Sequence, residues 1–149
     1  MNNLTIYILW AARLAAAIIL LQTLYFKFGA QAESVYIFAK LGVEPWGRIG
    51  SGIVELIASI LILFPRTSWI GAVLGLGVML GAIGAHLTIL GIDILGDGGY
   101  LFALGVIVAL SCVVILVLTR QQWLPIVSGF TFTQSVVKSE SVRRSGAHE

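Results

Sequence analysis

Charged side chains are scarce in this chain of 149 residues. They make up 11% of the sequence, whereas hydrophobic residues make up 58%; ordinary soluble domains have about 25% charged residues. A soluble domain of this size could not hide so much apolar surface from water, but lipid solvates outward-facing apolar side chains. The net charge is only +2 and the basic residues are not clustered, so no nucleic-acid partner is expected.

Cysteine is almost absent. Cys112 is the only one and lies within an apolar run. One cysteine cannot form an intrachain disulfide, a Cys-x-x-Cys pair or a thiolate metal cage, so any dithiol chemistry would need a partner. We interpret Cys112 as a small core hydrophobe rather than a reactive thiol. The sequence also lacks a phosphate-binding loop, a nucleophile elbow and a metalloprotease motif.

What the sequence does have is long apolar runs. A helix needs about 20 mostly apolar residues to cross the hydrocarbon core of a bilayer, and four segments qualify. The predicted spans cover about residues 4–28, 45–64, 69–92 and 100–118. The sequence therefore predicts an all-α fold, an integral membrane four-helix transmembrane bundle that forms one domain over residues 1–120.

The first loop is more than a linker. Ala30 to Leu41 contains an apolar stretch with Glu33 and Lys40 near its ends, and Gly42 follows as a natural helix C-cap. We expect a short helix between spans one and two, lying in the membrane interface. An ordinary surface helix that caps the bundle is an alternative with the same sequence pattern.

Basic residues near the span ends predict the orientation. Arg66 lies between spans two and three, and four more basic residues follow span four: Arg120, Lys138, Arg143 and Arg144. Since cytoplasmic loops carry an excess of lysine and arginine, we expect both termini in the cytoplasm. Residues 121–149 are predicted to form a polar cytoplasmic tail, largely disordered.

Small residues recur along span three. Gly71 and Gly75 are four residues apart, and Gly77, Gly81 and Ala85 form a second row with the same spacing. Such rows let helix backbones approach closely in lipid. Tight packing within one subunit is the first interpretation, and the seam of a homodimer is the alternative.

Ionisable residues within the spans are the candidate functional residues. A charged group deep in a bilayer costs at least about 2.5–3.5 kcal/mol, so it normally faces the bundle interior with a partner. The candidates are Arg13, Glu55 and His86, and Lys27 lies nearer the outer boundary of the membrane. From helix rise and helical angle, Glu55 lies between His86 and Arg13 in depth, so we expect Arg13 to reach toward it. Glu55 shares one stripe with Arg48, Ser51, Gly52 and Ser59.

This pattern has two interpretations. The polar residues could simply hold the helices together through buried ionic and hydrogen bonds. Alternatively, they form a ligand-binding pocket, in which Glu55 and His86 contact a polar headgroup, since histidine titrates near neutral pH. No metal is expected, because these residues with Asp93 provide too few ligands.

The order of these residues resembles the DoxX family of small four-span membrane proteins. The likeness lies in Arg13-Leu14, in Tyr25-Phe26-Lys27-Phe28, in Phe38-Ala39-Lys40-Leu41-Gly42, in Gly52-Ile53-Val54-Glu55-Leu56 with Ile60-Leu61-Ile62-Leu63-Phe64, and in Gly81-Ala82-Ile83-Gly84-Ala85-His86. It covers roughly residues 10–118. The resemblance implies the same four-helix architecture and, at the recurrent polar positions, Arg13, Lys27, Glu55 and His86 as binding residues.

Functionally, the resemblance implies several roles. One branch of the family resembles the membrane subunit of a thiosulfate:quinone oxidoreductase, another bacterial branch is associated with redox and detoxification complexes, and an animal relative is an assembly chaperone for receptor channels. The family's redox branches would place the chain in a bacterial inner (plasma) membrane. The lack of a cysteine pair puts direct thiol–disulfide exchange in doubt.

We therefore expect a bundle that binds a quinone or isoprenoid lipid as its ligand, with Arg13 holding Glu55 ionised. The alternative is a membrane chaperone or assembly factor with membrane-protein partners. Whether the chain is part of a quinone-linked oxidoreductase or a non-enzymatic binder stays open. A transporter is disfavoured, because the four spans show no inverted repeat or broken helix pair.

Overall fold

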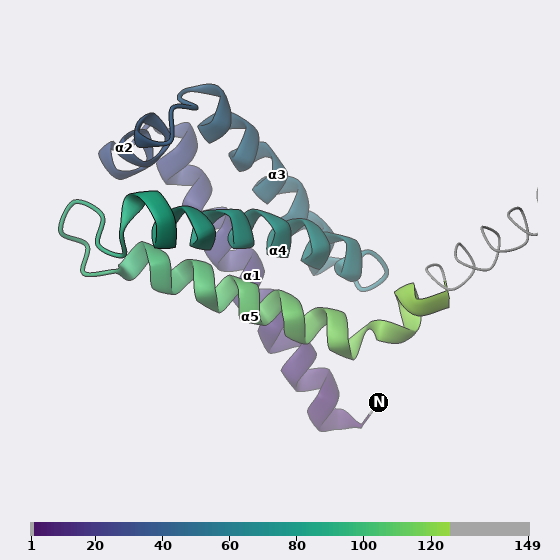
Figure 1. Ribbon diagram of the computed structural model, residues 1–149. Helices are drawn as coiled ribbons and strands as arrows, with labels where there is room; N and C mark the ends of the chain where they lie inside the picture. Colours follow the sequence, from purple (N-terminus) through teal and green to yellow (C-terminus); the bar gives the residue numbers. More distant parts are fainter. Residues whose placement is uncertain (1, 126–149) are drawn as a thin grey trace, which may run out of the picture.

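The apolar runs of the sequence are helices in the computed structural model, which describes residues 2–125. The helices are α1 (Asn3–Phe28), α2 (Ala32–Lys40), α3 (Trp46–Leu63), α4 (Ser68–Ala85) with its π-helical continuation η1 (His86–Leu90), and α5 (Tyr100–Leu118) (Figure 1). Four of them, counting α4 and η1 as one, are long and apolar enough to cross a membrane. The predicted fold class is confirmed: a four-helix membrane bundle with a short helix after the first span.

Each long helix packs against two neighbours. α1 and α4 occupy opposite corners of the bundle, and both contact α3 and α5. α1 has 26 residues whereas α3 has 18, and Figure 1 shows α1 running obliquely across α4 and α5. We call the end where α2 contacts α1, α3 and η1 the α2 end, and the opposite end, at residues 64–67, the turn end.

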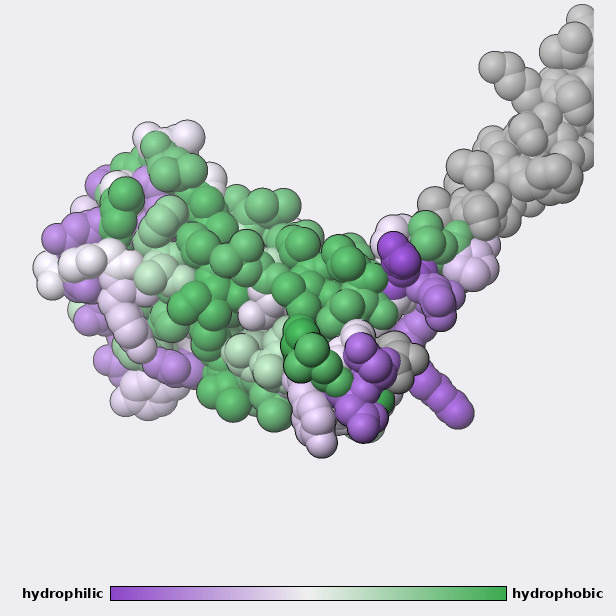
Figure 2. Space-filling model, turned by 90° about the horizontal axis from the view of Figure 1, so that it is seen from below, coloured by the Kyte–Doolittle hydropathy of each residue, from purple (hydrophilic) through white to green (hydrophobic). Residues whose placement is uncertain are grey.

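The outer surface of the bundle is apolar around its middle. Large leucine, isoleucine and valine side chains are exposed on all four long helices. Figure 2 shows hydrophobic residues across the middle of one face and hydrophilic residues gathered at its two ends. This distribution is what a bilayer requires, because the surface around the hydrocarbon core must be apolar.

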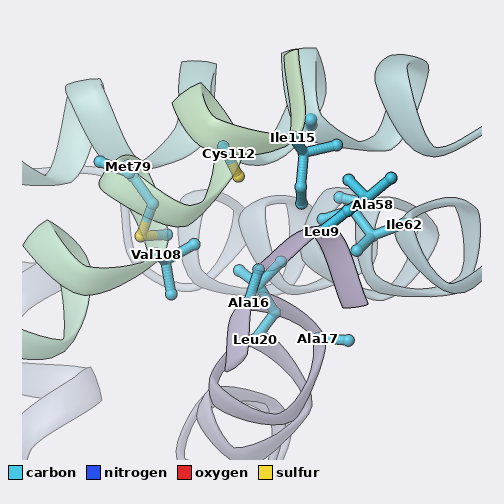
Figure 3. Close-up of a cluster of buried hydrophobic side chains, with 12 residues drawn as sticks. Leu9, Ala16, Ala17, Leu20, Ala58, Ile62, Met79, Val108, Cys112 and Ile115 are labelled. Carbon is cyan, nitrogen blue, oxygen red and sulfur yellow. The ribbon is translucent and has the colours of Figure 1, made fainter. Parts of the chain in front are cut away.

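The core is small and filled mostly by aliphatic side chains (Figure 3). It comprises Leu9, Ala16, Ala17, Leu20, Ala58, Ile62, Ala72, Met79, Val108, Ala109, Cys112 and Ile115. Gly71 allows α3 and α4 to approach here, since a Cβ at this position would lie 2.6 Å from the Ile62 backbone nitrogen. Cys112 is fully buried against Gly75, which agrees with its interpretation as a core residue.

The two rows of small residues in span three differ in their surroundings. Gly71 and Gly75 pack against neighbouring helices, as predicted for tight packing within one subunit. By contrast, a Cβ added at Gly77 or Gly81 would meet no atom within 4 Å. The second row therefore borders open space rather than a helix of the same chain.

Helix α2 ends in a regular cap. Gly42 has a φ of +72°, and its N–H donates to Ala39 O while the Val43 N–H donates to Phe38 O. This is a Schellman motif, in which glycine adopts the left-handed conformation at low cost. The predicted stop at Gly42 is therefore the place where the chain turns back toward α3.

Span three ends differently from the prediction of a helix to residue 92. The chain forms a π-turn at η1, where the Gly91 N–H donates to His86 O at 2.9 Å. In return, His86 Nδ1 lies 2.8 Å from Gly91 O. The spacing of seven residues predicts that His86 and Asp93 share one helical face. This prediction is wrong, because these two bonds end the helix at Leu90 and Asp93 lies in the loop.

The loop before α5 is organised by Asp97. Its carboxylate accepts hydrogen bonds from the backbone N–H groups of Ile94, Gly99 and Leu101 at 2.8–2.9 Å. Although desolvation raises the pKa of Asp97, these bonds and a contact with Asp93 outweigh it and lower the pKa below its ordinary value. Asp97 thus caps the start of α5 in place of Gly99, which has no side chain.

Gly71 and Gly81 provide a matched pair for a test of packing. Gly71→Ala should destabilise the protein by about 1–3 kcal/mol, because the new methyl group meets backbone atoms of α3 that cannot rotate away. Gly81→Ala should change stability by less than about 1 kcal/mol, since the methyl enters open space. Reversible unfolding in detergent would measure both, and equal losses would contradict this account of α4.

Asp97→Ala should remove the cap of α5 and cost about 1 kcal/mol at pH 7. Because the folded-state pKa is lowered, the carboxylate stabilises the fold above the unfolded pKa of about 3.9 and loses this effect as the pH falls through the lower folded value. The difference between wild type and variant should therefore shrink below about pH 4. Melting temperatures measured from about pH 3 to 7 would check this, and a gap between wild type and variant that does not change with pH would contradict it.

Candidate functional site

A cavity of about 370 Å³ lies at the α2 end of the bundle. α1, α4 and α5 form its walls, α3 contributes Ser51 and Glu55, and α2 covers it. Most of its lining is apolar, including side chains such as Ile19, Ile37 and Leu104. Polar groups line the same cavity from α1, α2, α3 and η1, so the space combines an apolar body with a polar part.

The polar part is built around a buried ion pair. Lys27 Nζ lies 2.6 Å from Glu55 Oε1, and the Glu55 side chain is only 1% exposed. The hydroxyl of Thr23, one helical turn before Lys27, lies 2.8 Å from Glu55 Oε2 and 2.7 Å from Leu20 O, and its single hydrogen can be donated to either oxygen. Both carboxylate oxygens thus contact α1, and the pair ties α1 to α3 away from water.

Lys27 keeps one ammonium N–H without a hydrogen-bond partner among the described residues. Its ammonium donates to Ser51 Oγ at 3.0 Å and to Glu55, which leaves the third hydrogen unused by the described residues. The ammonium also lies 5.5 Å from the centre of the Phe38 ring in α2, within the range of a cation–π contact. Lys27 lines the cavity with a side chain 14% exposed, so it can donate to a bound molecule.

His86 lines this site, and one of its ring nitrogens has no hydrogen-bond partner among residues 2–125. Its Nδ1 must donate, because the partner, Gly91 O, is a carbonyl. Nε2 has no partner in the described part of the chain and is not a fully buried atom. The ring of Phe102 packs against the His86 ring at the cavity. For a bound molecule, Nε2 would be an acceptor when the imidazole is neutral and a donor when it is protonated.

Helix α2 adds polar groups that the sequence reading missed. Glu33 lines the cavity and makes no ion pair within residues 2–125. Ser34 is 5% exposed, and its hydroxyl is buried with no hydrogen-bond partner. An unsatisfied buried hydroxyl costs free energy, so its place beside a cavity suits contact with a ligand.

The four predicted binding residues do not form one group. Lys27, Glu55 and His86 line the cavity, but Arg13 lies toward the turn end, where Nη2 donates to Ser68 Oγ at 2.9 Å and to Pro65 O at 3.5 Å. The expectation that Arg13 reaches Glu55 and holds it ionised is wrong: the cation beside Glu55 is Lys27.

The predicted polar stripe of α3 is buried or half-buried, as expected. Toward the start of α3, Arg48 pairs with Glu44 at 2.7 Å and donates to the Lys27 backbone oxygen. Thr23, Glu33 and Ser34 are the site residues that sequence reasoning did not identify. For Thr23 a signal existed, since a hydroxyl four residues before Lys27 lies on the same face of α1.

Within residues 2–125, no group of three or more histidine, cysteine, aspartate or glutamate side chains could hold a metal ion. Comparisons with protein-family models, with curated proteins and with solved structures gave no match. The resemblance to the DoxX family therefore stays a prediction from the residues quoted above.

The Lys27–Glu55 pair can be tested with a double-mutant cycle. Lys27→Met or Glu55→Met alone should cost about 3–5 kcal/mol, because each leaves an uncompensated charge in a low-dielectric interior. The double variant should cost clearly less than the sum of the single variants, since it removes both charges.

The free energy of unfolding in detergent or bicelles gives the coupling. Lys40→Met, which removes an exposed lysine near the same end, is the control and should change stability by less than about 1 kcal/mol. Additive losses at Lys27 and Glu55 would show that the two charges do not depend on each other.

Proposed function

We propose that the chain is a DoxX-like integral membrane protein that binds a hydrophobic ligand with a polar head, a quinone or an isoprenoid lipid, in the cavity at the α2 end. The proposal rests on one observation: within the described residues, an apolar cavity inside a membrane bundle is lined by polar groups without partners, such as the third N–H of Lys27 and the Ser34 hydroxyl. About 370 Å³ lies within the range of small-molecule sites, about 300–1,000 Å³. That volume suits a head and the first part of a tail.

The opening of the cavity supports a ligand that arrives from lipid. Gly77 and Gly81 line the cavity and are exposed, so the cavity reaches the surface of the bundle along α4. Both glycines lie in the middle of a span of 23 residues, Ser68–Leu90, at the depth of the hydrocarbon core. A ligand that partitions into the bilayer could leave its tail among the lipids there.

The polar groups fit a quinone head. The free Lys27 N–H would donate to a quinone carbonyl, whereas His86 Nε2 would accept from a quinol hydroxyl when neutral and donate when protonated. Glu55, held by Lys27 and Thr23, would keep the ammonium in place. These roles suit a redox-associated subunit, and they suit a passive binder of an isoprenoid alcohol equally well.

We further propose that both termini face the cytoplasm of a bacterial inner membrane. The exposed arginines of the turn end, Arg66 and Arg120, have no acidic partner in the described part of the chain. The basic residues Lys138, Arg143 and Arg144 follow α5 in the sequence and add to this side. The opposite side has Lys27, Lys40 and Arg48. The excess of lysine and arginine therefore lies on the side of the N-terminus, and such an excess is typical of cytoplasmic loops.

The decisive experiment fills the cavity without disturbing the fold. Gly81→Leu should abolish ligand binding, because its side chain enters the space that the ligand would occupy. Gly84→Leu is the matched control, since Gly84 has no atom within 4 Å of an added Cβ but does not line the cavity. Native mass spectrometry with lipid extraction should find a quinone or isoprenoid on wild type and Gly84→Leu, and none on Gly81→Leu or His86→Ala.

A short-chain ubiquinone, added to delipidated protein, provides a second measurement by calorimetry. Folded wild type that carries no extractable ligand and binds no added quinone would refute the proposal. In that case, a stable complex with membrane-protein clients, lost on Glu55→Gln, would favour the chaperone function instead.

A further inference from the structure

The turn end of the bundle carries only positive charge over the residues that the structure describes. Arg13, Arg66 and Arg120 lie there. Every acidic residue between positions 2 and 125 lies toward the α2 end: Glu33, Glu44, Glu55, Asp93 and Asp97. The two ends of the molecule therefore differ in the sign of the charge that they offer to the two membrane surfaces.

Arg13 is the buried member of these three cations. It is 3% exposed, and its two hydrogen bonds both come from Nη2. The Nε–H is buried and has no partner, and Nη1 makes no hydrogen bond but is not a fully buried atom. A guanidinium has donors on all three nitrogens, so most of its capacity is unused beside a surface without carboxylates.

The start of α4 lies directly against this guanidinium. Ser68, the first residue of α4, accepts from Arg13 Nη2 at 2.9 Å. The backbone N–H groups of Ser68 and Trp69 make no hydrogen bond within the described residues, and Thr67 provides no side-chain cap. The N-terminus of this 18-residue helix thus adds unpaired donors and a partial positive charge next to the arginine.

Tryptophans place this arrangement at the membrane interface. The Trp10 ring centre lies 5.2 Å from Arg13 Cζ, and Trp69 and Trp123 lie at the same end of the bundle. Tryptophan is enriched at the level of the lipid headgroups, where phosphodiesters are the abundant anions. Basic sites between helices at this level bind acidic headgroups.

We propose that Arg13, with Ser68 and the first turn of α4, binds the phosphate of an anionic phospholipid in the leaflet at the turn end. The phosphate oxygens would accept from Nη1 and, after a small shift, from Nε, and from the free N–H groups of α4. This site is separate from the cavity and does not depend on its ligand: Arg13 precedes Lys27 by fourteen residues, or about 21 Å along α1 at 1.5 Å per residue.

The test uses delipidated, full-length protein in neutral detergent. Phosphatidylglycerol should raise the melting temperature of wild type by a few degrees, because a lipid that binds only the folded state stabilises it. Phosphatidylcholine should raise it less. In Arg13→Gln the rise should disappear, whereas Arg120→Gln, which removes an exposed arginine at the same end, should keep it.

Inorganic phosphate distinguishes the two sources of the anion. A rise with phosphate alone that matches phosphatidylglycerol and requires Arg13 would assign the site to a free anion and overturn the lipid assignment. An equal response to phosphatidylglycerol in wild type and Arg13→Gln would overturn the site itself.

A photo-activatable phosphatidylglycerol analogue keeps the proposal testable if Arg13→Gln fails to fold. In wild-type protein, the label should concentrate on peptides that contain Trp10–Arg13 or the first turn of α4. Label spread evenly over the exposed faces of α1 and α5 would show that the lipid has no preferred site.

Discussion

A buried carboxylate in a membrane bundle needs a cation, and the pairing of Glu55 with Lys27 is the constraint on which the α2 end depends. Because the partner sits near the end of α1 and Glu55 lies in the middle of α3, the pair fixes how far the two helices slide past each other. It also draws Thr23 and Ser51 into one hydrogen-bonded group. The cavity lies beside this group, so the contacts that hold α1 to α3 also position the polar groups that a ligand would meet.

Much of the fold could be predicted from the sequence, because lipid imposes simple rules on length and polarity. The four apolar runs had to be helices, since every backbone hydrogen bond must be made within the segment. The buried stripe on α3 and the stop at Gly42 followed from helical angle and from glycine's tolerance of positive φ. The π-turn at His86 could not be predicted, because its residues, His86–Leu90, simply continue an apolar run.

The candidate site was predicted only in part, and the error has a physical cause. Straight helices that share one axis would place Lys27 near the membrane surface and leave Arg13 as the partner for Glu55. In the structure, the last turn of α1 lies beside the middle of α3, where Lys27 pairs with Glu55. Glu33 and Ser34 were missed because an amphipathic helix outside the spans gives no sign of which face will cover a cavity.

The unequal lengths of α1 and α3 have a consequence for how the bundle fits the bilayer. At 1.5 Å per residue, α1 is about 39 Å long and α3 about 27 Å, against a hydrocarbon core of about 30 Å. α1 therefore exceeds the thickness of the hydrocarbon core, whereas α3 falls slightly short of it. α1 is the longest and α3 the shortest of the four spans, and the two are joined at Lys27 and Glu55. The ion pair thus ties together the two helices that match the bilayer in opposite ways.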